Sequence, residues 1–171
     1  TLLTLFILLF SSSVVADDIS DFEIEGMSIG DSLLDYISVE QIKKNIRQNS
    51  YEGSDHKFYD IEIYDSSLLK TYDGLQISLK KNDNQYIVHS IGGGIFFESN
   101  EIEKCYSKQD EIDKDLILMF KNTQRNYRSK IPHPGYANST LTSITYVFKS
   151  GDNIELTCFD WGNEIDAEDY L

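Results

Sequence analysis

The sequence predicts an α+β domain: two short N-terminal helices, a five-stranded antiparallel sheet, and one long helix packed on it between strands three and four. Three observations lead to this expectation. Apolar residues alternate in short segments joined by polar turns, as in meandering antiparallel strands. Two capped segments with helical periodicity precede the first strand, and a third follows the third strand. Because strands come in runs, the helices should cover one side of the sheet.

The two N-terminal helices are expected at about 29–36 and 39–48. Ser28 with Asp31, and Ser38 with Gln41, fit capping boxes, in which a pair of side chains satisfies free backbone N–H groups at a helix start. Apolar residues at three- and four-residue steps follow each box, as on the buried face of a helix.

Three strands are expected next, at about 57–64, 75–81 and 85–97. In the first strand, Asp60 and Glu62 alternate with apolar residues, so we expect both carboxylates on a solvated face. Gly92-Gly93-Gly94 interrupts the third strand, where a bulge or sharp bend is expected.

The long helix gives the strongest periodic signal of the chain. Asn100 is its expected cap, with Glu103 in the first turn. One face carries a stripe at helical spacing that consists of Ile102, Cys105, Gln109, Ile112, Leu116 and Met119. A loop at 130–140 follows, and two strands at about 144–148 and 154–158 meet at a turn over 150–153.

The first sixteen residues resemble a secretory leader. They contain no charge, and an apolar run over 2–10 is followed by small residues before Asp17. The run is shorter than a membrane span, and a basic region before it is missing. We therefore expect a leader truncated at its start (1–16), an acidic lead-in (17–26), a single domain (27–161) and an acidic tail (162–171). The mature protein would be exported, to the periplasm or the medium, and would not be an integral membrane protein.

Export changes the interpretation of the two cysteines. In an oxidising compartment two lone cysteines usually pair, so we predict a Cys105–Cys158 disulfide from the helix to the last strand. A thiol catalyst would need a nearby histidine and an electropositive pocket, and the local sequence offers neither.

Two family resemblances agree with these expectations. Ile24-Glu25-Gly26-Met27-Ser28, leading into two helices and three strands, resembles the small α-α-β-β-β envelope lipoproteins that assist outer-membrane protein assembly, and related inhibitor-type periplasmic domains, over about residues 24–97. The lipoprotein cysteine is absent. More of the chain resembles an uncharacterised family of small exported marine-bacterial proteins, through 26–32, 70–73, 102–112 and the hairpin ending at Cys158. That resemblance implies export and paired cysteines, and no mechanism.

Catalytic signatures are largely missing from the sequence. No nucleophile elbow, zinc-protease motif, redox dithiol or phosphate loop occurs. Ser54, Asp55 and His56 are adjacent in one loop, whereas a catalytic triad usually converges from separate elements. The alternative to a binding protein is a hydrolase or other enzyme that uses Asp60 and Glu62, and also His89, for acid–base work. We predict no cofactor and no metal site.

The charge distribution names a candidate surface. The net charge of −14 argues against nucleic-acid binding, because phosphate backbones repel an acidic surface. Residues 116–151 contain five basic residues and no acid, so the rest of the chain carries −19. We predict a non-enzymatic binding module whose loop 121–140 contacts an anionic protein surface, lipid head group or glycan. Its contact residues would be Arg125, Tyr127, Arg128, Lys130, His133 and Tyr136. The alternative is that these bases balance neighbouring acids and a helix end.

Overall fold

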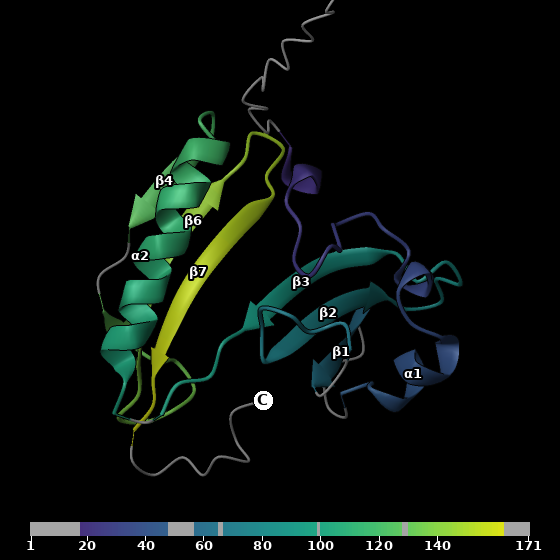
Figure 1. The fold of residues 1–171 in the computed structure, drawn as a ribbon, viewed down its shortest axis with the longest axis horizontal. Coiled ribbons are helices and arrows are strands. Elements are labelled where there is room, and N and C mark those ends of the chain that lie inside the picture. The colour runs from purple at the N-terminus through teal and green to yellow at the C-terminus, as the bar shows by residue number, and fades with distance from the viewer. Residues whose placement is uncertain (1–17, 48–56, 65–66, 99, 128–129, 163–171) are drawn as a thin grey trace, which may run out of the picture.

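The computed structural model describes residues 18–47, 57–64, 67–98, 100–127 and 130–162 (Figure 1). The chain forms 3-10 helices at Ile19–Asp21 and Leu33–Asp35, then α1 (Val39–Lys44), β1 (Phe58–Tyr64), β2 (Gly74–Lys80), β3 (Val88–Gly94), α2 (Ile102–Met119), β4 (Gln124–Tyr127), β5 (Ile131–Pro132), β6 (Thr140–Val147) and β7 (Asn153–Asp160). The predicted α+β class with antiparallel pairing is confirmed. The predicted leader, the group Ser54, Asp55 and His56, residue Arg128 and the tail beyond 162 lie outside the described residues.

The seven strands form two sheets, so the prediction of one five-stranded sheet is wrong. One sheet has the order β1-β2-β3, and the other contains β4, β5, β6 and β7. β7 pairs with β6 along its whole length, so β4 and β5 must both lie along the opposite edge of β6. These two strands escaped prediction because all four β4 side chains are exposed and β5 contains a proline, which leaves no alternating pattern.

The first half packs the N-terminal segment onto β1-β2-β3. Met27, Leu33 and Ile42 are fully buried against the apolar side of this sheet. The predicted helix at 29–36 is wrong, because backbone bonds from Gly30 and Leu33 run to carbonyls of residues 88 and 86 and leave only a 3-10 turn. The second helix is confirmed but ends at residue 44. Its predicted capping box is present, with both the Ser38 and the Gln41 side-chain bonds.

The three glycines of β3 lie in regular register with β2, so the predicted bulge at this point is wrong. The irregularity falls at His89, because Ser78 pairs with Ser90 and the next residue of β2 pairs with Val88. A close side chain accounts for Gly93, whereas a Cβ atom on Gly92 would meet nothing within 4 Å. A Cβ atom on Gly93 would lie 2.5 Å from a ring carbon of Tyr72. The glycine run therefore admits an aromatic ring against the backbone.

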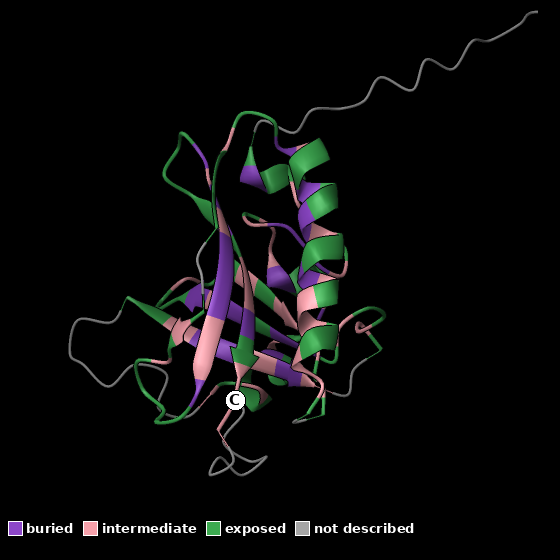
Figure 2. Ribbon diagram, turned by 90° about the vertical axis from the view of Figure 1, so that its left-hand side faces the viewer, coloured by how far each residue is buried: buried purple, intermediate pink, exposed green. Residues whose placement is uncertain are grey.

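In the second half, α2 covers one face of the sheet formed by β4, β5, β6 and β7. Leu116, Phe120, Ile144 and Tyr146 form the centre of its core. Figure 2 shows the buried stripe of α2 turned toward the strands and its exposed side turned away. The predicted disulfide is confirmed: Cys105 on α2 is bonded to Cys158 on β7, with Cα atoms 5.9 Å apart. The predicted Asn100 cap is wrong, since Glu101 is the N-cap and makes no side-chain cap bond.

The segment expected as a solvated acidic lead-in connects the two cores. Ile19 is buried in the second core and Ile24 in the first, while Phe22 packs against both. The Phe22 ring meets Phe120 edge-on at 6.2 Å between centroids. Glu25 accepts three backbone N–H bonds from residues 70–72 and so fixes the loop before β2. The packed structure therefore includes the segment from residue 18 onward.

Candidate functional site

Arg125, the first of the predicted contact residues, is bonded within the protein. Its Nε and Nη2 atoms donate to the two carboxylate oxygens of Asp113 at 2.8 and 2.7 Å. The Tyr146 hydroxyl donates to the same carboxylate. The Arg125 bonds, with help from Tyr146, lower the pKa of Asp113 despite its partial burial. This bidentate pair ties β4 to α2, which is a structural use of the arginine.

The other predicted basic and exposed residues are separated from one another. Lys130 forms an ion pair with Asp160 of β7. Tyr127 is 65% exposed at the end of β4. Arg128 lies outside the described residues. Of the two described bases at the centre of the expected loop, Arg125 and Lys130, each is therefore neutralised by a carboxylate of its own chain.

The two remaining predicted residues, His133 and Tyr136, belong to an aromatic cluster with Phe159 and Trp161. The His133 ring lies 5.0 Å from Tyr136 and 5.2 Å from Trp161, measured between centroids. Tyr136 meets Trp161 edge-on at 5.3 Å. Phe159 and Trp161 are stacked at 5.2 Å with their planes 8° apart. We call these four residues the aromatic cluster; Phe159 remains 43% exposed and Tyr136 40%.

Backbone bonds hold the loop that carries His133 and Tyr136. The N–H of His133 donates to the Ser139 carbonyl at 2.8 Å, and the N–H of Gly135 donates to His133 Nδ1 at 3.0 Å. Gly162 donates to Ser139 Oγ at 3.0 Å, which attaches the end of β7 to the loop. These bonds therefore fix the backbone on which the His133 and Tyr136 rings are carried.

The sheet register places the predicted residues on two different faces. Arg125 pairs with Tyr146, and both side chains point toward α2. Phe159 alternates with Cys158, whose disulfide points to α2, so the aromatic cluster lies on the opposite face. We call this the outer face; in register it also carries Gln124, Asn126, Ile131, Leu141, Ser143, Thr145, Val147, Asn153, Glu155 and Thr157.

The residues of the enzyme alternative are held by neighbours. Asp60 is 2% exposed rather than solvated as expected, and it accepts a bond from Ser78 Oγ at 2.6 Å. Glu62 forms an ion pair with Arg47 at 3.0 Å. The His89 ring packs against the exposed Phe58 at 5.0 Å. Asp60 is thus buried, Glu62 is paired with a base and His89 packs against an aromatic ring.

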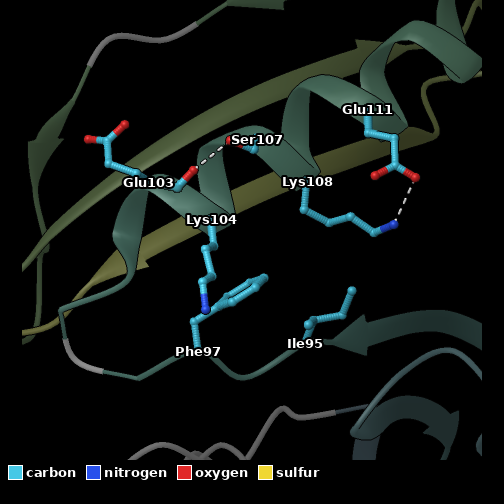
Figure 3. A pocket seen from close by; sticks show the side chains of 7 residues that line it. All are labelled: Ile95, Phe97, Glu103, Lys104, Ser107, Lys108 and Glu111. Atoms are coloured by element: carbon cyan, nitrogen blue, oxygen red, sulfur yellow. Dashed lines mark hydrogen bonds and ion pairs between the residues drawn. The ribbon is translucent and has the colours of Figure 1, made fainter.

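An open groove of about 440 Å³ runs between α2 and the segment that follows β3. Figure 3 shows Ile95 and Phe97 on one side, with Lys104 reaching toward Phe97 from the helix. Lys104 is paired with Glu101, and Lys108 with Glu111 at 2.9 Å. Each lysine is thus paired with a nearby glutamate, and the carboxylate of Glu103 also lines the groove.

Sequence reasoning missed Asp113, Phe159 and Trp161. Asp113 lies on the buried side of α2, where a polar residue breaks the apolar periodicity. Phe159 and Trp161 continue the alternation of β7 on the face opposite Cys158, a signal that the sequence does contain. Within the described ranges, no group of three or more potential ligands could hold a metal ion, and no helix is long and apolar enough to span a membrane.

The chain matches no family model, no curated protein and no solved structure.

Proposed function

We propose that the protein is an exported, non-enzymatic binding module and that the aromatic cluster on the outer face is its contact surface. The observation that supports this proposal is a contiguous set of four rings, partly exposed and held by backbone bonds. Exposed apolar patches on a soluble domain mark interaction sites more often than stability needs. Tyrosine and tryptophan are also the side chains that most often dominate binding energy.

This surface is a revision of the contact loop expected from charge. His133 and Tyr136 stay in it, and Phe159 and Trp161 join them from β7. Arg125 and Lys130 leave it, because each is bonded to a carboxylate on the helix side. Arg128 stays a prediction.

Affinity capture from the envelope and secreted fractions of the source organism tests the proposal. Wild-type protein is compared with Tyr136→Ala and with Phe96→Ala, which removes a 53% exposed ring in the other half of the molecule. We expect a protein or polysaccharide that is retained by the wild type and by Phe96→Ala and lost with Tyr136→Ala. Equal retention by all three would refute the aromatic cluster as the contact surface.

A further inference from the structure

The Phe159 ring is stacked on one side and partly exposed. Trp161, which follows the end of β7, stacks on it with planes 8° apart. The His133 ring also contacts Phe159, at 5.9 Å between centroids. Thr157, two residues earlier, lies on the same side of the strand as Phe159. With 43% of Phe159 exposed, the ring can still receive a flat apolar surface.

On the same side of the sheet, three oxygen-bearing side chains form a connected row in which Ser143 is fully buried, Thr157 is half-buried and Glu155 is exposed. Ser143 Oγ and Thr157 Oγ1 lie 2.9 Å apart, and the Thr157 hydroxyl donates to the Glu155 carboxylate at 3.1 Å. Glu155 is exposed and its carboxylate has further acceptor positions. An aromatic wall next to hydroxyl and carboxylate groups offers stacking and hydrogen bonding to one ligand at the same time.

The outer face carries little charge, which selects among ligands. Of the described outer-face residues that the register assigns, Glu155 is the one with an acidic or basic side chain. A phosphate or carboxylate on a ligand would be repelled by Glu155, with Arg125 and Lys130 engaged on the other side of the sheet. A neutral ligand rich in hydroxyl donors fits this surface, because each hydroxyl can donate to the carboxylate in a charge-assisted bond.

From these observations we infer that the outer face binds a neutral oligosaccharide of pyranose units. The C–H groups on one face of a pyranose ring would stack on the exposed part of the Phe159 ring, because the face of an aromatic ring carries the negative part of its quadrupole. Its hydroxyls would bond to Glu155 and Thr157. This inference rests on the proposed binding function and commits it to one ligand class.

The chain contains a single tryptophan, Trp161, so intrinsic fluorescence reports directly on this site. Titrations of the full chain use cellohexaose, xylohexaose and mannohexaose as neutral probes and hexagalacturonate as an anionic one. We expect a saturable fluorescence change with a neutral hexaose and about tenfold weaker binding for Phe159→Leu, which keeps an apolar side chain without a ring. Phe159→Tyr, which keeps the ring, should bind as the wild type does.

Two further variants separate the contributions. Glu155→Gln removes the charged acceptor and should weaken binding by about threefold to tenfold, whereas Phe96→Ala should leave it unchanged. Circular dichroism establishes that each variant is folded. Binding of hexagalacturonate alone would overturn the neutral-ligand inference and leave the proposed function in place. Capture of a protein that depends on the aromatic cluster, without binding of any hexaose, would do the same. Failure of both the titration and the capture would overturn both proposals.

Discussion

In both halves of the molecule a helix precedes antiparallel strands, but the two halves are stabilised in different ways. In the first half, α1 precedes β1, β2 and β3, which pair in sequence. In the second half, α2 precedes four strands, of which β4, β5 and β7 all pair with β6. The first half buries eleven apolar residues in one cluster, and the second buries seven. The second half adds the disulfide and the polar contacts of Asp113 and Gln109 with the strands.

The outward sides of the two sheets also differ. On the first sheet, Asp60 is buried beside Ser78 and Gln76, and Phe58, which is 38% exposed, contacts the His89 ring. On the second sheet, four rings form one cluster. A disulfide and directional polar bonds join α2 to the other side of this sheet. We infer that these bonds on the helix side leave the outer face free to carry the aromatic cluster.

The largest expected effect comes from removing the crosslink. Replacing Cys105 and Cys158 together by serine should lower the free energy of unfolding by about 4 kcal/mol, because the 53-residue separation adds loop entropy to the unfolded chain. Hydrogen exchange should show α2 and β7 losing protection before β1 and β2. Equal loss of protection in both halves would contradict the comparison, since it would mean that the halves unfold as one unit.

A cavity in the first half should have the opposite effect on hydrogen exchange, with protection lost first in β1-β2-β3 rather than in α2 and β7. Ile77 is fully buried at the centre of β2, between Ile61 and Ile91 in register. Ile77→Ala should cost about 3 kcal/mol through lost burial and an unfilled cavity. Denaturant unfolding gives the total, and hydrogen exchange should place the earliest opening in β1-β2-β3. If α2 opened first in this variant, apolar burial would not be what stabilises the first half in particular.

A smaller loss is expected from the polar link of the second half. Asp113→Asn removes the charge that Arg125 faces. We expect the free energy of unfolding to fall by about 2 kcal/mol, less than for a fully buried pair, because the arginine side chain is 35% exposed. Glu111→Gln on the same helix breaks the exposed pair with Lys108 and is the matched control, with an expected loss below about 0.5 kcal/mol. Equal losses in the two variants would show that the Asp113 contact stabilises no more than a surface pair.

Lowering the pH should remove the stabilisation by the Asp113–Arg125 pair from the wild-type protein. Arg125 holds the pKa of Asp113 below its usual value of 3.8 in the folded protein. The unfolded chain therefore binds a proton first, so the stabilisation is complete above about pH 4 and is lost as the pH falls through the folded pKa. The stability difference between wild type and Asp113→Asn should shrink below about pH 4 in urea unfolding. A difference that stays constant down to pH 2 would place its origin elsewhere than in the ionised carboxylate.

The comparison also shows which features a sequence can reveal. Periodicity over a few residues predicts strands β1, β2 and β7 and helix α2. The presence of two cysteines predicts the disulfide. The division into two sheets, by contrast, is not visible in local periodicity, and neither is the packing of Phe22 against both cores. The proposed contact surface keeps two of the residues named from the sequence, and that assignment stays a prediction. His133 and Tyr136 stood out in a loop of unusual composition, but Arg125 was assigned to a ligand because Asp113, twelve residues earlier, gave no sign of being its partner.

The smallest expected effect compares the two helix starts. Ser38 makes both halves of a capping box with Gln41 at the start of α1, so Ser38→Ala should cost about 1 kcal/mol. The sequence predicts a similar role for Asn100, but α2 begins at Glu101 without a side-chain cap bond. Asn100→Ala should therefore change the free energy of unfolding by less than about 0.3 kcal/mol. Urea unfolding of the two variants side by side measures the difference. A cost for Asn100→Ala equal to that of Ser38→Ala would contradict this expectation. It would mean that Asn100 caps α2 as Ser38 caps α1.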